Sequence, residues 1–480
     1  MSDIAEIPVD EQERPLPPPP PPIRSALTDG PILRTLLSLA WPNVIGLSAG
    51  ICVVIAETSY VGRLGVEALA AMALVFPTII LTMTMSGGAM GGAVASAIAR
   101  ALGAGNRERA GILAVHAMLI GIGFGLVFML GMLVFGPKLL EMLGGRGDVL
   151  THAIAYTQVF FGGAVLPWLL NTMAGILRGT GNMKLPSFLI LNSAAWQIVL
   201  GGTLGLGLGP VPQLGMRGVA AGALIAYTMN IGIMSWYLFS GRARITLKLR
   251  GLRIQWAMFF DILKVGAIAC FSPLQSVLTI SIFTHMLAQF GTAILAGYGV
   301  GARLEFLLTS IAFSFGIACV PMVGMAIGAG RIARARRIAW TASVAAFVAV
   351  GAPACLVAIF PDLWVNMFTD SAAVRAASHQ YLSTVGPFYA FFGLATTMYF
   401  SSQGAAKVIG PVLAQTARLI YIAGIGWWLS THGANAQSFF WLAASSMVVL
   451  GLLSCSSVVL TRWGPREAKP AITPALSIGD

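Results

Sequence analysis

The chain has 480 residues, of which 57% are hydrophobic and only 10% are charged, and its mean hydropathy is +0.83. Soluble globular domains carry roughly 25% charged residues, so this composition excludes a soluble protein. The net charge of +12 is compatible with nucleic-acid binding. However, the positive residues lie in short segments between long apolar stretches, where they act as topology signals, and we expect no nucleic-acid partner.

The composition also argues against a metal centre and against ATP hydrolysis. The five cysteines are scattered within apolar sequence and lack the paired or CxxC spacing that metal sites and disulfide frameworks require. No Gly-Lys dipeptide occurs in the chain, so no Walker A loop is available to bind ATP phosphates. We therefore predict no metal, no cofactor and no nucleotide hydrolysis.

A polar N-terminal segment precedes the apolar part of the chain. Residues 1–34 contain a proline run at 17–22 and no apolar core of a signal peptide, which predicts a disordered cytoplasmic tail. Twelve apolar segments follow, each long enough to cross a bilayer as a helix. They are residues 35–58, 67–99, 110–136, 151–177, 185–208, 216–239, 258–289, 292–329, 338–360, 380–404, 409–430 and 434–461.

The distribution of positive charge predicts the topology. If the first segment leaves the cytoplasm, the cytoplasmic connections hold fifteen Lys and Arg residues and the outer connections hold five. By the positive-inside rule both termini, including the tail at 462–480, lie in the cytoplasm. We therefore expect a multi-pass protein of the plasma (inner) membrane.

The two halves of the chain resemble each other. Leu102-Gly-Ala-Gly matches Ile327-Gly-Ala-Gly, Pro137 matches Pro361, and four pairings of this kind have offsets of 223 to 226 residues. Six helices therefore recur after six helices, and an even number of helices per half makes the repeats parallel.

The predicted fold is an all-α membrane protein with twelve transmembrane helices in two parallel-repeat six-helix bundles. The N-terminal lobe would span 35–240 and the C-terminal lobe 258–461, joined by a basic cytoplasmic linker at 241–257. Two similar bundles that rock about a site between them suit transport by alternating access.

Ordered sequence motifs carry a resemblance to a known family. They are Leu39-Ala-Trp-Pro42, Glu57-Thr-Ser-Tyr-Val-Gly-Arg-Leu-Gly65, Gly103-Ala-Gly-Asn106, Leu177-Arg-Gly-Thr-Gly-Asn-Met-Lys184 and Gly209-Pro-Val-Pro-Gln-Leu-Gly-Met-Arg-Gly218. In this order and spacing, the portion from about 35 to 461 resembles the multidrug and toxic compound extrusion (MATE) transporters.

The resemblance implies an antiporter in which entry of H⁺ or Na⁺ drives export of amphipathic, often cationic, organic compounds. The expected partners are a small-molecule substrate and membrane lipids, and we expect a monomer. One alternative is a lipid-linked saccharide flippase of the same superfamily, which tends to have a more cationic cavity. A membrane-embedded acyltransferase is a further alternative, but its reactive cluster of a histidine with polar partners is missing, and we expect no enzyme.

Glu57 is the first candidate for ion coupling, because an ionisable side chain inside the hydrocarbon layer costs several kcal/mol and usually has a functional reason. It stands where the family usually has an aspartate. Asn192 and Gln197 could orient its carboxylate or offer carbonyl oxygens to Na⁺, or they could join helices. Many relatives carry an aspartate four residues after Gln197, but this chain has Gly201. That difference leaves Glu57 as the sole acid of this lobe, unless it is an interfacial residue in contact with headgroups and water.

Three residues are candidates in the second lobe. Arg303 and Glu305 are two residues apart on one helix, so they point in different directions and need separate partners. Glu305 could attract a cationic substrate or the coupling ion, with Arg303 tuning it, or both could fix their helix against its neighbours. His285 could face Glu57 from the opposite lobe as a proton acceptor, or it could be a packing residue.

Overall fold

The computed structural model describes residues 26–245, 247 and 254–464, and within this part of the chain the secondary structure is helical without strands. The predicted tails lie largely outside the described residues, and so do residues 246 and 248–253 of the basic linker.

The first half contains a series of helices interrupted at defined points. They are α1 (Ala26–Asp29), α2 (Ile32–Gly62), α3 (Val66–Met83), the π-helix η1 (Thr84–Met90), α4 (Gly91–Gly103), α5 (Arg107–Met142), α6 (Gly147–Gly162), α7 (Val165–Gly179), α8 (Lys184–Leu206) and α9 (Gly215–Phe239).

The second half follows the same plan. Its helices are α10 (Trp256–Ala269), α11 (Phe271–Ala288), α12 (Thr292–Gly328), α13 (Ile332–Ile359), α14 (Asp362–Val365), α15 (Ala372–Val385), the 3₁₀ turn η2 (Gly386–Phe388), α16 (Tyr389–Gly404), α17 (Ile409–Thr431) and α18 (Ala436–Leu460).

These elements account for the twelve predicted segments. Ten continuous helical stretches of the described chain are long and apolar enough to cross a membrane, and the pair α6 and α7, bent by 48°, forms an eleventh. The elements α15, η2 and α16 occupy the position of the segment predicted at 380–404. That helix starts at Ala372 instead, because one face of α15, with Ala377, Tyr381 and Leu382, is buried against α12 and α18.

Several predicted segments contain irregular points. The segment at 67–99 includes the π-helix η1, the one at 151–177 bends after Gly162, and the one at 258–289 changes from α10 to α11 at Cys270 without a sharp bend. Pro273 in the first turn of α11 has no backbone N–H, so the missing hydrogen bond costs little there. Apolar composition predicts a span but carries no information about such interruptions.

The end of the predicted tail is ordered, which corrects the boundary drawn at residue 34. Leu27 of α1 is buried in the core, and the Arg331 guanidinium donates to the Thr28 carbonyl at 3.1 Å and to the Asp29 carboxylate. Helix α2 then begins at Ile32. This short stretch is thus joined to the opposite half of the chain by apolar burial and by hydrogen bonds from Arg331.

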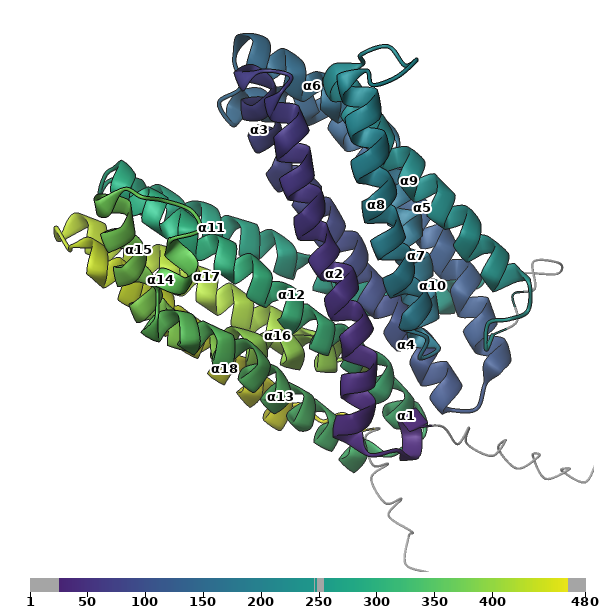
Figure 1. The fold of residues 1–480 in the computed structure, drawn as a ribbon. Coiled ribbons are helices and arrows are strands. Elements are labelled where there is room, and N and C mark those ends of the chain that lie inside the picture. Colours follow the sequence, from purple (N-terminus) through teal and green to yellow (C-terminus); the bar gives the residue numbers. More distant parts are fainter. Residues whose placement is uncertain (1–25, 246, 248–253, 465–480) are drawn as a thin grey trace, which may run out of the picture.

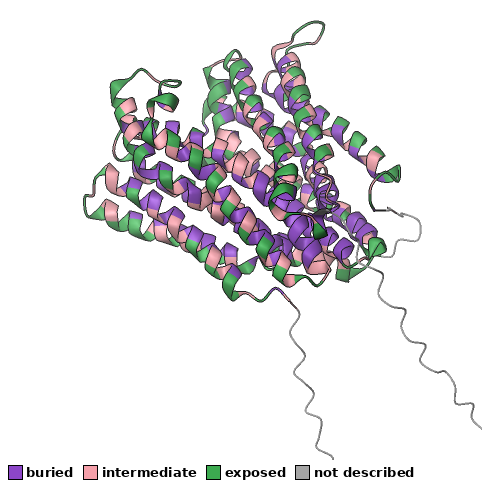
Figure 2. Cartoon of the chain, turned by 60° about the horizontal axis from the view of Figure 1, so that its bottom comes forward, coloured by how far each residue is buried: buried purple, intermediate pink, exposed green. Residues whose placement is uncertain are grey.

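The same helix pairs recur in each half, as the sequence repeat predicts. Helices α2 and α8 pack together like α11 and α17, and α8 packs on α9 like α17 on α18. Figure 1 shows the two bundles diverging from the end that carries α1 and α4. In Figure 2, exposed residues follow the outer helix faces, where large apolar side chains such as Trp41, Phe135 and Trp427 lie, as expected for contact with lipid.

The two bundles meet along α4 and α12. A Cβ on Gly324 would lie 2.8 Å from Ala99 Cβ, and one on Gly328 would lie 3.0 Å from the Ala104 nitrogen. Nearby, Ser96 Oγ on α4 donates to the Gln403 carbonyl of α16. Small residues therefore hold the lobes in backbone contact at this end of the molecule.

Candidate coupling and substrate site

Glu57 lies on α2 five residues before the helix ends, and it is only 7% exposed. Gln197 of α8 donates from Nε2 to Glu57 Oε1 at 2.9 Å. No described Lys, Arg or His side chain lies within ion-pairing distance of this carboxylate. The structure thus brings together two of the three residues predicted in the first lobe.

Asn192 belongs to a different contact. Its Nδ2 donates to Asn230 Oδ1 of α9 at 3.0 Å, and Asn230 Nδ2 donates to the Ala226 carbonyl at 2.9 Å. This chain of amides joins α8 to α9, and no hydrogen bond of the described residues connects Asn192 to Glu57. The packing interpretation of Asn192 therefore fits its surroundings.

Three tyrosines surround the first carboxylate. Tyr60, Tyr156 and Tyr227 come from α2, α6 and α9, and all lie within electrostatic range of Glu57. Tyr60 Oη is buried without a hydrogen-bond partner among the described residues. Glu57 therefore faces the interior of its own lobe.

Tyr60 lies against Gly201, the position at which the sequence comparison with the family expected an aspartate. A Cβ on Gly201 would lie 2.7 Å from Tyr60 Oη, so the phenol would have to shift to admit a side chain there. The phenol of Tyr60 therefore occupies the space that a side chain at position 201 would need.

The second lobe repeats this arrangement around Glu305 of α12. Tyr389 Oη donates to Glu305 Oε2 at 3.4 Å, and Tyr381 and Tyr389 share a hydrogen bond of 3.1 Å between their hydroxyls. Tyr298 lies within electrostatic range, and so does Arg418 of α17. In each lobe a carboxylate within a spanning helix is thus surrounded by three tyrosines, and in the second lobe Arg418 also lies near it.

Arg418 rather than Arg303 is the basic residue directed into this cluster. The Arg418 side chain is buried and its Nε donates to Ser446 Oγ at 3.3 Å. Arg303 is exposed, and its guanidinium lies over the Phe368 ring at 5.0 Å from the centroid. The two neighbours Arg303 and Glu305 point apart, as their spacing predicts.

His285 is exposed on α11. Within the described part of the chain it makes no hydrogen bond or ion pair, so the structure does not bring it to Glu57. The described residues also contain no group of three His, Cys, Asp or Glu side chains that could hold a metal ion.

An ion-pair network ties the first helix of the second half to the first lobe. Asp261 of α10 binds Arg100 of α4 at 3.2 Å, Arg109 of α5 at 3.0 Å and Lys264 at 2.7 Å. Asp261 is mostly buried by these contacts. One carboxylate thus binds three cations where the lobes meet.

Sequence analysis did not identify five of the residues in these clusters. They are Tyr156, Tyr227, Tyr381, Arg418 as the partner of Glu305, and Asp261. For Asp261 and Arg418 a usable signal was present, since charges within apolar segments are rare and need partners. The tyrosines offered no such signal, because aromatic residues are common in apolar helices.

Comparison with known proteins identifies the family. The MatE family model matches residues 47–203 and 269–428, one stretch in each half. A FAD transporter of Shewanella oneidensis is 27% identical over 320 residues, which cover 65% of this chain and 69% of the relative. A probable multidrug resistance protein NorM of Deinococcus radiodurans is 26% identical over 446 residues, covering 88% of this chain and 94% of the relative.

Solved structures share the fold. A MOP superfamily transporter from Pyrococcus furiosus superposes with a TM-score of 0.84 at 22% identity. The match covers 90% of this chain and 96% of that transporter. The outward-facing conformation of a multidrug resistance MATE family transporter gives a TM-score of 0.82 at 23% identity. The match covers 91% of this chain and 98% of that transporter. The predicted twelve-helix fold in two repeats is confirmed. Since the family model matches more than half of the chain, this protein belongs to the MatE family, the multidrug and toxic compound extrusion transporters, and is an integral membrane transporter rather than an enzyme.

Proposed function

We propose that this protein is a cation-coupled antiporter that exports amphipathic, often cationic, organic compounds by alternating access. The observation that carries the proposal is the buried Glu57 carboxylate, which has an amide donor in Gln197 and no cationic partner among the described residues. A carboxylate in such a place can bind and release a proton, or can bind Na⁺. Relatives named as multidrug resistance proteins support the substrate class.

Glu305 has a complementary role in this proposal. Its carboxylate is partly accessible and is bound by Tyr389, so it can attract a cationic substrate to the second lobe. The buried Arg418 guanidinium also attracts the Glu305 carboxylate, so it competes with a cationic substrate for this negative charge. We therefore assign ion coupling to Glu57 with Gln197, and substrate attraction to Glu305.

The remaining features of the proposal follow from sequence. The lobes would comprise residues 35–240 and 258–461, with both termini on the cytoplasmic side of the plasma membrane, because the basic connections gather at that end. The protein would act as a monomer, with each lobe supplying its own carboxylate.

Glu57→Gln is the test of the coupling role. In proteoliposomes with an imposed proton or Na⁺ gradient, the variant should lose gradient-driven ethidium transport down to the level of protein-free liposomes, because the amide cannot take up the ion. Ethidium binding to the purified protein should stay close to the wild-type value. Wild-type transport by the variant would refute the assignment.

Glu67→Gln is the matched control. Glu67 lies in the first turn of α3, is exposed, and undergoes the same chemical change. Ethidium transport by the Glu67→Gln variant should equal that of the wild type in both the proton and the Na⁺ gradient. Comparing the two gradients in the wild type identifies the coupling ion.

Export of a flavin dinucleotide is a second candidate function. It is favoured by the FAD transporter of Shewanella oneidensis, which aligns over 65% of this chain. Proteoliposomes loaded with FAD in place of ethidium distinguish the two, since a multidrug exporter would move ethidium and leave FAD inside.

A further inference from the structure

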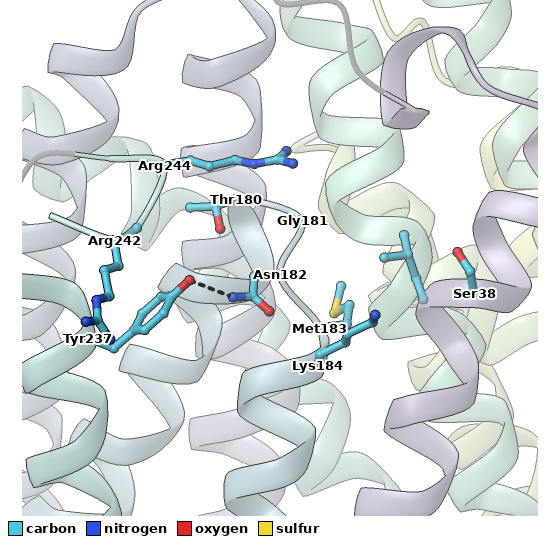
Figure 3. A pocket seen from close by; sticks show the side chains of 11 residues that line it. Ser38, Thr180, Gly181, Asn182, Met183, Lys184, Tyr237, Arg242 and Arg244 are labelled. Atoms are coloured by element: carbon cyan, nitrogen blue, oxygen red, sulfur yellow. Dashed lines mark hydrogen bonds between the residues drawn. The ribbon is translucent and has the colours of Figure 1, made fainter.

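A pocket of about 490 Å³ lies at the end of the first lobe that is close to α1, away from both carboxylates. Four segments line it: the start of α2 with Ser38 and Leu39, the α7–α8 turn at 180–184, Tyr237 of α9, and residues 242–244 after that helix. Figure 3 shows the polar side chains of these segments around one space. We call it the basic pocket.

The charge of the basic pocket is entirely positive. Lys184, Arg242 and Arg244 line it, and no lining residue is acidic. These three side chains form no ion pair with a described carboxylate. Arg178, two residues before the lining turn, is also buried without a described carboxylate partner. Three solvent-accessible cations around one pocket, with no acidic lining residue, attract an anion.

Neutral donors complete the pocket. Asn182 Nδ2 donates to Tyr237 Oη at 3.3 Å, as Figure 3 shows, which leaves the Tyr237 proton free for a ligand. Helix α8 has 23 residues and begins at Lys184, so the positive end of its dipole also lies at the pocket. A phosphate group, with several acceptor oxygens and negative charge, matches cations and hydroxyl donors together.

The surroundings place the pocket at the level of lipid headgroups. Trp236, next to Tyr237, is 58% exposed, and Arg242 lies over its ring at 4.5 Å from the centroid. Trp41, one turn from Ser38, is also exposed. Exposed tryptophans of this kind mark the interface between membrane and water.

We propose that the basic pocket binds a phosphate group, carried either by an anionic phospholipid or by a soluble phosphate compound. This site is separate from the coupling carboxylate, so it stands whether or not Glu57 couples transport.

The test compares two triple variants of the full-length protein. The pocket variant combines Lys184→Gln, Arg242→Gln and Arg244→Gln. The control variant combines Arg107→Gln, Arg337→Gln and Lys407→Gln, three exposed residues of the same end that form no ion pair in the described structure. Both variants change the net charge equally, and thermal unfolding checks that both are folded.

Binding is measured in two arms. Native mass spectrometry compares the affinity for phosphatidylglycerol with that for phosphatidylcholine. Calorimetry in lipid-free detergent measures the affinity for inorganic phosphate. The pocket variant should lose affinity for at least one phosphate ligand by about tenfold or more, while the control variant binds as the wild type does.

The two binding measurements distinguish a phospholipid from a soluble phosphate compound as the ligand. Loss of phosphatidylglycerol binding alone identifies a lipid site, and loss of inorganic phosphate binding identifies a site for soluble phosphate compounds. The proposal is overturned if wild type and pocket variant bind both ligands equally, if neither ligand binds the wild type, or if the control variant loses as much affinity.

Discussion

At the scale of single residues, Tyr60 in the first lobe determines how much space is available near Glu57 and Gly201. Tyr60 lies one helical turn from Glu57 on α2, and its phenol fills the space beside Gly201. A side chain at position 201 would have to displace the Tyr60 hydroxyl. The glycine and the tyrosine are thus one structural feature, which is visible only when α2 and α8 are packed together.

The coupling between these two residues can be tested by stability. Gly201→Ala should destabilise the protein by about 1–3 kcal/mol, because its Cβ would overlap Tyr60 Oη. Tyr60→Phe removes that oxygen, so the double variant should recover most of the loss. Thermal unfolding of the purified proteins in detergent measures both effects.

Gly202→Ala is the control for this pair. Its Cβ would lie 3.5 Å from Tyr60 Cδ1, an ordinary van der Waals contact, so the change should be tolerated. Equal destabilisation by the two alanine variants would show that Tyr60 is not the cause.

At the scale of elements, α10 belongs to the second half by sequence but packs on the first. It contacts α4, α5 and η1, and Asp261 binds cations of two of these helices. Hydropathy predicts a continuous span at 258–289, which cannot reveal that its first part joins the other lobe. Both the ion pairs of Asp261 and the buried apolar face with Ile262 and Val265 join α10 to the first lobe.

Asp261→Asn should weaken this junction. Arg100 and Arg109 would lose their carboxylate while Arg100 stays mostly buried, and we expect a loss of about 1–3 kcal/mol in stability, less than for a fully buried pair. Thermal unfolding at low salt measures the loss. A variant as stable as the wild type would show that the network adds nothing.

Asp362→Asn provides a matched comparison on the surface. Asp362 pairs with Arg375 at 2.8 Å and with His379 at 2.9 Å, but it is well exposed, so its loss should matter far less. The hydrogen bond from Arg375 lowers the pKa of Asp362, assisted by His379. The stability it adds is therefore present at neutral pH and disappears as the pH falls through the lowered pKa in acid.

At the scale of the whole molecule, the lobes are held together at one end by backbone contact. Gly324 and Gly328 of α12 lie against Ala99 and Arg100 of α4, and Gln403 of α16 donates to the Gly88 carbonyl at 3.3 Å. Figure 1 shows the bundles separating away from this end. A rocking motion that opens this end has to separate these small residues.

Gly328→Ala should hold the lobes apart at this end. The new Cβ would lie 2.9 Å from the Arg100 carbonyl carbon and 3.0 Å from the Ala104 nitrogen, and backbone cannot give way as a side chain can. Spin labels at positions 107 and 337, on opposite lobes, should report a longer mean distance by pulsed electron resonance. Transport should fall at the same time.

Gly299→Ala on the same helix is the control. Its Cβ would meet nothing within 4 Å, so label distance and transport should match the wild type. If Gly328→Ala leaves the label distance unchanged, the close packing at this end does not limit the approach of the lobes.

The sequence by itself determined the class of protein, the number and approximate position of the helices and the internal repeat. These properties follow from apolar length and charge placement, which act locally because each spanning helix satisfies its own backbone hydrogen bonds. The sequence also singles out Glu57 and Glu305 as candidates, since a carboxylate at that depth is costly anywhere in the chain.

Only the tertiary structure decided which residues meet. Gln197 reaches Glu57 but Asn192 binds Asn230, and Arg418 rather than Arg303 is directed toward Glu305. These partners lie on helices whose rotation and depth depend on packing between segments far apart in the chain. Residues 26–29 likewise contact the opposite half of the chain, where Arg331 binds Asp29, and no local pattern predicts a contact between segments so far apart.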